Sequence, residues 1–436
     1  MRSLLAALTA GAVLLGAAPA LANGRFPAAG QVIVDPADGD HLVVRATFGL
    51  LRSRDRGASV GFICEGAVGY AGQEDPMMAL GGDGALLAGL YAGLAISRDD
   101  GCTWAIAGGA LEGLSVIDLS VRPTGMRETL VLAAKLAGGG DGVPRVLRSI
   151  DGAQSFTALP GALPADFLAL TLDAAPSDPS IIYVSGRFGA PDYQGALLRS
   201  KDDGESWERL DIAGLVDRLP YIAAIAPDDP ATVYARIDDL PGDRLIVSHD
   251  GGAHWDDLFA GQGDLLAFAL SPDGAALVVG GDEDGLQHAT SASPTFTKVS
   301  AIQARCAAWT KEGLYVCADQ LADGFSLGFS KDGIEALTPL MSLDVVCGPL
   351  ACPAESGVAT KCPVEWEMLA PRLNAEGCAP DAGTGATTGG SSGGGGGTCG
   401  CGVPGEPSST VGSIVTLLVT VLALRRRRFT SRPSSR

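Results

Sequence analysis

The sequence predicts an all-β protein built from seven similar units, and three observations lead to this prediction. A pattern of eight residues, Ser-x-Asp-x-Gly-x-x-aromatic, recurs with starts at residues 53, 97, 149, 200, 248, about 289 and 330. Short apolar strands flank the copies. Glycine contributes 61 of the 436 residues, and helical periodicity is scarce. A regular period of this size is typical of repeat folds.

Each copy of the pattern, called an octet here, is interpreted as a hairpin turn between two strands. In such a turn Ser and Asp bond backbone groups, Gly takes a positive φ, and the aromatic residue packs beneath. The copy at 53 ends in Val60, the copy at 149 has Ala153 at the glycine position, and the sixth copy lacks its Asp. The predicted turn residues are Ser53, Asp55, Gly57, Ser97, Asp99, Gly101, Trp104, Ser149, Asp151, Phe156, Ser200, Asp202, Gly204, Trp207, Ser248, Asp250, Gly252, Trp255, Ser330 and Asp332.

With these residues the chain resembles the Asp-box, or bacterial neuraminidase, repeat. Proteins with this repeat include the β-propellers of sialidases, sortilin-type receptors, xyloglucanases and photosystem assembly factors. Residues 200–207 and 248–255 match the repeat well. The resemblance implies four-stranded blades whose boxes lie at the periphery, away from the ligand face, and it implies no particular activity.

One template repeats from residue 31 to about residue 343. An apolar strand ends in a Pro/Asp turn, a second strand and a loop follow, and a third strand leads through the octet into a fourth. Unit five shows this plan at residues 221–226, 232–236 and 244–247. Seven such units predict a seven-bladed β-propeller over residues 23–343, within the usual range of four to eight blades. A pair of β-sandwiches is the alternative.

The N-terminus has the features of a secretory signal over residues 1–22. Arg2 supplies the positive start, residues 4–15 form the apolar run, and Ala-Leu-Ala at 20–22 resembles a cleavage site. A short anchor helix is the alternative. We therefore expect the mature protein to begin near Asn23 and to be exported.

The C-terminal tail, residues 399–436, is predicted to carry the protein to the cell surface. It contains Cys399 and Cys401, an apolar run at 411–424 and four arginines at 425–428. Fourteen residues in a helix cover roughly 21 Å, less than the ~30 Å hydrocarbon core of a bilayer. The positive-inside rule leaves the preceding chain outside. The tail resembles the myxobacterial C-terminal sorting signal, which implies processing near the cysteines; an ordinary anchor is the alternative.

Cysteine usage also suits an oxidising compartment, because none of the ten cysteines lies in the signal. Cys306 and Cys317 lie near the ends of consecutive strands and are predicted to bridge one hairpin. Cys64 and Cys102 adjoin successive octets and form a second pair by elimination. Residues 344–382 are too few for a core of their own. We expect two disulfides there, in any of three pairings, among Cys347, Cys352, Cys362 and Cys378.

Residues 383–398 are nearly all Gly, Ser and Thr, which predicts a flexible linker without a core.

Composition excludes some partners. Setting aside Arg2, the six arginines after residue 424 and Glu406 leaves 24 basic and 49 acidic residues, so the body between the signal and Cys399 carries a charge of about −25. Such a body repels nucleic acid and anionic membranes. Nucleic acid is therefore not an expected partner.

The ligand site is expected on the face opposite the octets, at the ends of the second strands. Four cations at equivalent positions of an acidic chain predict one positive patch, which would recognise carboxylates or sulfates. The alternative is solvated strand ends that form local salt bridges. The predicted ligand-binding residues are Arg45, Tyr91, Lys135, Arg187, Arg236, Asp282 and Asp319.

Catalysis finds weaker support in the sequence. A sialidase-like enzyme needs an arginine triad and a Tyr–Glu pair, and Arg25-Phe26-Pro27 is only a distant echo of the family's Arg-Ile-Pro motif. A xyloglucanase-like enzyme needs two facing carboxylates, for which Asp282, Glu283 and Asp319 are candidates. The four histidines suggest neither a triad nor a metal site. No cofactor and no metal are indicated.

The sequence therefore predicts an exported, surface-tethered propeller that binds an extracellular glycan or protein partner without chemistry. A secreted glycoside hydrolase is the first alternative. A scaffold for envelope assembly is the second. Contact with the membrane is expected only through the C-terminal tail.

Overall fold

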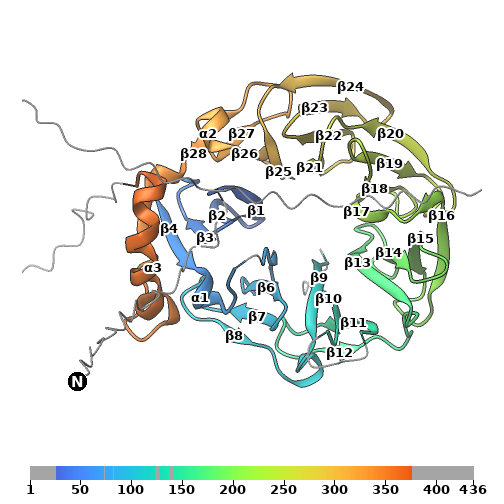
Figure 1. The fold of residues 1–436 in the computed structure, drawn as a ribbon, viewed down its shortest axis with the longest axis horizontal. Coiled ribbons are helices and arrows are strands. Elements are labelled where there is room, and N and C mark those ends of the chain that lie inside the picture. Colours follow the sequence, from blue (N-terminus) through green and yellow to red (C-terminus); the bar gives the residue numbers. More distant parts are fainter. Residues whose placement is uncertain (1–25, 73, 82, 123–127, 137–141, 376–436) are drawn as a thin grey trace, which may run out of the picture. The chain divides into compact units, whose positions relative to one another are not determined.

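The computed structural model describes residues 26–72, 74–81, 83–122, 128–136 and 142–375. These residues form seven β-sheets, each built from four consecutive antiparallel strands, around a central axis (Figure 1). The first strand of each sheet lies nearest the axis and the fourth lies outside (Figure 1). The predicted seven-bladed β-propeller is therefore confirmed.

The strands follow one another around the ring without exchange between blades. Blades 1 to 4 contain β1 (Ala29–Asp35), β2 (Asp38–Ala46), β3 (Gly49–Ser53), β4 (Val60–Cys64); β5 (Met77–Leu80), β6 (Leu86–Leu90), β7 (Gly93–Ser97), β8 (Ala105–Ile106); β9 (Ser115–Val121), β10 (Thr129–Ala134), β11 (Pro144–Ser149), β12 (Thr157–Ala158); and β13 (Phe167–Ala174), β14 (Ile182–Phe188), β15 (Gln194–Ser200), β16 (Glu208–Val216). Blades 5 to 7 contain β17 (Leu219–Ile225), β18 (Val233–Asp238), β19 (Arg244–Ser248), β20 (Asp256–Ala260); β21 (Leu265–Leu270), β22 (Ala276–Gly281), β23 (Gly285–Thr290), β24 (Ser293–Ser300); and β25 (Ala304–Trp309), β26 (Leu314–Ala318), β27 (Leu327–Ser330), β28 (Thr338–Met341).

Strand direction gives the ring two distinct faces. Within each blade the strands alternate in direction, so the second strand ends where the next blade's first strand begins. We call this side the upper face. The turn between the third and fourth strands, which holds the octet, lies at the other ends of the strands, on the lower face.

The core lies between neighbouring blades rather than within one sheet. Alternate residues of a strand point to opposite faces of its sheet. In β10, Leu130 and Leu132 pack toward blade 4 with Ile182, whereas Val131 packs toward blade 2 with Leu87. Because each sheet is covered on both faces, its central strands are continuously apolar.

Five octets form the same hydrogen-bonded turn, those starting at residues 53, 97, 149, 200 and 248. The Ser hydroxyl donates to the Asp carboxylate at 2.7–2.9 Å. It also accepts from the backbone N–H four residues later at 2.8–2.9 Å. Hydrogen bonds from Ser155, first from its hydroxyl and then from its backbone N–H, lower the pKa of Asp151 well below its usual range. The turn therefore keeps its carboxylate ionised.

The octets of blades 6 and 7 depart from this geometry, as their sequences suggest. In blade 6 the third and fourth strands meet in a tight turn that pairs Thr290 with Ser293. In blade 7, Gly333 N–H donates to Ser330 Oγ over three residues instead of four, at 3.0 Å. The loss of the Asp in blade 6 thus coincides with loss of the eight-residue turn.

The octet at residue 149 has Ala153 at the position where the other regular octets have Gly. Positions four and five of each regular octet both have positive φ, as in Asp203 (59°) and Gly204 (84°). In the octet at 149 these positions are Gly152 (71°) and Ala153 (60°), so a residue with a Cβ adopts the left-handed conformation. That conformation is costly for residues other than glycine.

The chain beyond blade 7, which we call the closing segment, covers the outer edge of blade 1. A 3₁₀ turn, η3 (Leu343–Val345), leads into β29 (Val346–Pro349), which pairs in parallel with β4 as a fifth strand. The helix α3 (Gly357–Leu373) then packs beside β4 and the short α1 (Glu65–Val68) (Figure 1). This closing segment was not predicted as regular structure.

Its disulfides correct two predictions. Cys64 is bonded to Cys362 and Cys102 to Cys352, so the closing segment is attached to blades 1 and 2. The expected Cys64–Cys102 bridge was wrong, and the four cysteines after residue 343 do not form two bridges among themselves. The physical reason is that the chain returns to the open outer edge of blade 1, which places its cysteines beside those of the first two blades. The predicted hairpin bridge between Cys306 and Cys317 is confirmed.

Several predicted segments lie outside the described residues. These are the signal at 1–22, Cys378, the linker at 383–398 and the tail with Cys399, Cys401 and the apolar run at 411–424. In the part of the chain that the structure describes, no helix is long and apolar enough to cross a membrane. Cys347 is disulfide-bonded.

Candidate functional site

The structure brings the predicted ligand-binding residues to one face. Arg45, Arg187 and Arg236 lie near the C-terminal ends of the second strands β2, β14 and β18. The other members follow directly after second strands, and all seven positions are therefore on the upper face. These others are Tyr91, Lys135, Asp282 and Asp319.

The three arginines are occupied by neighbouring groups. Arg45 pairs with Asp75 at 3.1 Å and donates to the Gly30 carbonyl at 3.0 Å. Arg187 pairs with Asp217 in the loop that leads to blade 5. Three of the four predicted cations thus form local salt bridges, which is the alternative that the sequence left open. Binding of a ligand by these residues stays a prediction.

Arg236 lies in a small pocket between blades 5 and 6. Its guanidinium carbon is 4.5 Å from the centroid of the Tyr221 ring, and its Nη1 donates to Asp243 Oδ2 at 2.5 Å. Asp243 is buried and also accepts from the Leu265 N–H at 3.0 Å. The pocket has a volume of about 190 Å³ and includes the apolar side chain of Phe268. It is small compared with typical ligand sites.

The two predicted carboxylates of blades 6 and 7 share one cation. Arg305, in β25, places Nη2 2.7 Å from Asp319 Oδ2 and 3.4 Å from Asp282 Oδ2. Asp319 also caps the short helix α2 (Gln320–Asp323) by accepting from two of its backbone N–H groups. The arrangement links blades 6 and 7 and holds the two carboxylate oxygens within about 6 Å of each other, because both bond the same nitrogen.

Side chains of the innermost strands join successive blades around the axis. Gln31 bonds both backbone groups of Met78, and Asp118 Oδ2 accepts from Leu172 N–H at 2.8 Å. Burial raises the pKa of Asp118 to about 7, against the effect of its backbone hydrogen bonds, and nearby Asp173 adds to the rise. These contacts were missed because nothing in the local sequence indicates which strand lies across the blade interface.

The lower face carries a second set of contacts between blades that the sequence did not reveal. Asp100, in the octet of blade 2, is paired with Arg52, Arg54 and His41 of blade 1. Asp203, in the octet of blade 4, accepts from Arg122 and Arg148 of blade 3. The octet of each of these blades is thus held by arginines of the blade before it.

Two further octets are held through their backbones. Arg199 of blade 4 donates to the carbonyls of Asp250 and Gly251 in blade 5, at 3.1 and 2.7 Å. Arg98 of blade 2 donates to the Gly152 carbonyl of blade 3 at 2.9 Å. We call Arg98 and Arg199 the lower-face clamps. In the sequence, each lies next to the Ser that begins the octet of its own blade.

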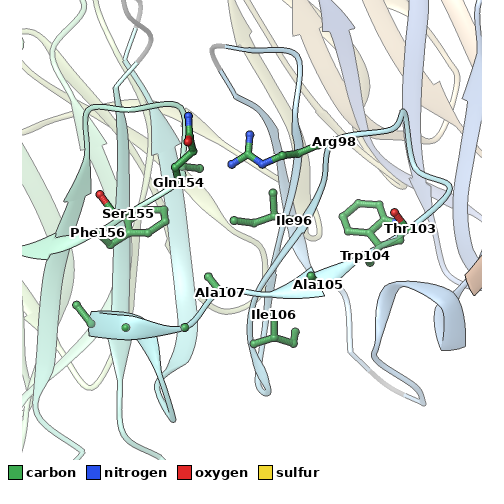
Figure 2. A pocket seen from close by; sticks show the side chains of 14 residues that line it. Ile96, Arg98, Thr103, Trp104, Ala105, Ile106, Ala107, Gln154, Ser155 and Phe156 are labelled. Atoms are coloured by element: carbon green, nitrogen blue, oxygen red, sulfur yellow. The ribbon is translucent and has the colours of Figure 1, made fainter.

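A larger groove lies at the periphery between blades 2 and 3, with a volume of about 740 Å³. Figure 2 shows Trp104 and Phe156 on its two sides, Ile96 between them, and Arg98 and Gln154 near one end. Phe156 is buried, and the Trp104 indole N–H donates to the Gly101 carbonyl at 2.9 Å. Both aromatic side chains are therefore part of the octet turns, and Arg98 is a lower-face clamp.

Exposed apolar side chains are distributed unequally between the faces. Of sixteen large hydrophobic residues that are exposed, ten are at upper-face ends of strands or in upper-face loops. The two exposed on the lower face are Ile150 and Ile334. The ten are Phe26, Met77, Tyr91, Leu136, Leu168, Tyr193, Val216, Leu240, Leu266 and Leu321. Concentration of apolar surface on one face is typical of interaction sites.

The described residues contain no group of three or more His, Cys, Asp or Glu side chains arranged to hold a metal ion. The acidic turn at Asp282-Glu283-Asp284 illustrates why. Asp282 is bound to Arg305, and Asp284 accepts from the Gln262 N–H at 3.0–3.1 Å. This turn uses its carboxylates within the protein.

No family model and no curated protein sequence matches the chain. Among solved structures, an ancestral GH74 enzyme has a similar fold, with a TM-score of 0.50 and 16% identity over 68% of this chain and 44% of that chain. A GH74 xyloglucanase from Xanthomonas campestris gives 0.35, with 16% identity over 74% of this chain and 65% of that one. The extracellular domain of a putative one-component system from B. thetaiotaomicron gives 0.49, with 12% identity over 70% and 38%. The chain thus spans less than half of the ancestral enzyme, and likeness at these identities concerns the fold alone.

Proposed function

We propose that this protein is an exported β-propeller that binds an extracellular partner through its upper face without chemistry. The observation that supports this most is the concentration of exposed apolar side chains on the upper face. Loops that carry apolar residues on a rigid scaffold are suited to recognition. The upper-face arginines that were expected to bind a ligand instead hold the loops in place through local ion pairs.

The blades are proposed to be Asp-box repeats. The support is the shared Ser–Asp–Gly hydrogen-bond pattern of five octets and their place at the turns between third and fourth strands. On this proposal the octets have a structural role. The partner, an extracellular glycan or a protein, would then be met on the face opposite them.

Export and surface attachment complete the proposal. The support is the N-terminal pattern at 1–22, the sorting-type tail at 399–436 and three disulfides within the described residues. Disulfides persist in oxidising compartments. Protease added to intact cells is expected to release the propeller, because a Gly/Ser-rich sequence such as residues 383–398 is a preferred kind of cleavage site. Full resistance of the propeller, together with free thiols, would contradict export.

Binding is tested with the mature chain and cells of its source that lack the gene. We expect saturable retention of the labelled protein on these cells, without release of soluble sugar. Absence of saturable retention would contradict the binding function. Release of sugar would favour the enzyme.

Glycoside hydrolysis is the second candidate, and one observation favours it. Asp282 and Asp319 lie within about 6 Å of each other through Arg305, close to the separation of the two carboxyl groups in retaining glycosidases. Both carboxylates bond Arg305, however, whereas such an enzyme uses one carboxyl group to protonate the leaving group and the other to attack the sugar. Hydrolysis of xyloglucan or a sialoside that is lost in Asp282→Asn and Asp319→Asn would establish this alternative. An envelope scaffold would show neither hydrolysis nor saturable retention.

A further inference from the structure

Four exposed apolar residues of blades 4 and 5 follow one another across the upper face, and we call them the strip. It consists of Leu168, Tyr193, Val216 and Leu240, whose exposed fractions are 52%, 41%, 56% and 79%. Arg187 lies between Leu168 and Tyr193. It is opposite Leu168 in the β13–β14 strand pair, and its guanidinium carbon is 5.5 Å from the centroid of the Tyr193 ring.

The strip continues across the interface between the two blades. The Asp217 N–H donates to the Tyr193 carbonyl at 2.8 Å, which holds Val216 beside Tyr193. The next residue, Arg218, donates to Asp239 Oδ1 at 2.9 Å, and Leu240 follows Asp239. Leu168 and Val216 are thus at upper-face ends of strands, Tyr193 and Leu240 are in loops, and hydrogen bonds and ion pairs hold these segments together.

The charges around the strip are unequal in exposure. The Asp217 side chain is 70% exposed, whereas its partner Arg187 is 24% exposed. Asp192, next to Tyr193, is 48% exposed and faces Arg209. In these two pairs the carboxylate is more exposed than its guanidinium partner, whereas in the Arg218–Asp239 pair the arginine is more exposed, at 38% against 21%. The surrounding body carries a charge of about −25, which strengthens a negative potential at the strip.

We propose that the strip binds a polypeptide partner whose aliphatic side chains are flanked by lysine or arginine. This inference rests on the proposed binding function and names the partner's chemistry. Aliphatic side chains of the partner cover Leu168, Tyr193, Val216 and Leu240, and its cations meet the outward carboxylates. A second copy of this chain and an anionic membrane are both disfavoured, because each would bring negative charge to a negative surface.

The test uses the purified full chain with its disulfides intact and a labelled synthetic peptide that alternates leucine and lysine. Val216→Ser with Leu240→Ser removes two exposed aliphatic residues of the strip. Ile150→Ser with Ile334→Ser is the matched control, since these residues are 58% and 57% exposed on the lower face. We expect the strip variant to bind the peptide about tenfold more weakly, and the control to bind like wild type.

Two further peptides separate the apolar and charged contributions. Replacing leucine by serine, or lysine by glutamate, is expected to abolish measurable binding in each case. Equal loss in the strip and control variants, or equal binding of the glutamate peptide, would overturn the inference.

Other occupants of the strip are tested with the same variants. Sedimentation of a dimer that the strip variant abolishes, or flotation with phosphatidylglycerol vesicles that it abolishes, would also overturn the inference. Cell retention keeps this test separate from the proposed function. If wild type is retained and the strip variant is retained equally, the strip inference fails while the binding function stands. If wild type is not retained, the binding function itself fails.

Discussion

The two faces of the propeller use the same kinds of side chain for different purposes. On the lower face, arginines such as Arg122 and Arg199 are nearly buried and reach into the octet of the following blade. On the upper face, arginines such as Arg187 are more exposed and pair with a loop carboxylate. Contacts between blades occur on both faces, since Arg305 also links blades 6 and 7 on the upper face. The lower face differs in that its contacts are made to repeated turns, whereas the upper face carries loops that differ from blade to blade.

This difference explains why the octets are alike and the upper loops are not. An octet must present a fixed backbone to the preceding blade, so its Ser, Asp and Gly positions allow few changes. An upper-face loop within a blade has only to connect the second strand to the third strand. In blade 7 it contains α2, and in blade 5 it is an Asp-Leu-Pro-Gly-Asp segment.

The closing segment provides the largest expected effect on the lower-face framework. Cys102→Ala with Cys352→Ala removes a bridge that spans 250 residues and attaches an octet to the closing segment. We expect a loss of about 4 kcal/mol in the free energy of unfolding, because with Cys64–Cys362 intact this bridge still closes a loop of roughly 50 residues in the unfolded chain. Cys306→Ala with Cys317→Ala, which opens a bridge of only 11 residues, is the control and should cost less. Denaturant titration measures both, and equal losses would argue against closure by this segment.

The arginines allow the most direct comparison of the faces. Arg122→Ala removes a buried cation that bonds Glu128 and Asp203, although Arg148 still pairs with both, and we expect a loss of about 2–3 kcal/mol. Arg187→Ala removes a more exposed pair on the upper face and should cost less than about 1 kcal/mol. Thermal and denaturant unfolding of the two variants give the contrast. Similar losses would mean that the upper pairs also hold the blades together.

Between the faces, Asp118 predicts a dependence on pH. Burial raises its pKa to about 7, so the folded protein holds a proton at pH values where the unfolded chain, with a pKa near 3.8, has lost it. This contribution to stability is complete below pH 4 and declines as the pH rises to about 7. We expect a decline of about 2 kcal/mol between pH 5 and pH 6.5, at most 1.36 kcal/mol per pH unit. Asp118→Asn should flatten the curve, and an unchanged slope would assign the effect elsewhere.

The smallest expected effect concerns the octet at residue 149. Ala153 has φ of 60°, where a glycine is favoured, so Ala153→Gly relieves strain. We expect a gain of at most about 1 kcal/mol, reduced by the loss of a buried methyl group. Calorimetry of the variant checks this. The opposite change at Gly204, to Ala, should destabilise the protein.

Much of the fold could be predicted because each octet contains its own turn. Ser200, Asp202 and Gly204 bond one another within a few residues, so the local sequence is sufficient to identify the turn and its period. The contacts between blades could not be predicted in this way. Asp100 and Arg52 are far apart in the chain, and either residue alone resembles an ordinary surface charge.

The candidate site shows the same limit. The sequence placed Arg45, Arg187 and Arg236 correctly at equivalent strand ends, but it could not show their carboxylate partners. Asp75 and Asp217 belong to loops between blades, and their positions depend on how the next sheet packs. The cysteine pairing was missed for a related reason, since it depends on where the chain goes after the last blade.

That final path has a consequence for the order of assembly during synthesis. Blade 1 is made first, yet its outer edge is completed by β29 and its Cys64 is bonded to a cysteine of α3, which is made last. A chain released before about residue 373 can fold all seven sheets and pack blade 7 against blade 1, but the outer edge of β4 is left without its parallel partner. An exposed edge strand can pair with another chain, so the last segment also protects blade 1 from edge-to-edge association, and shortened products are expected to aggregate.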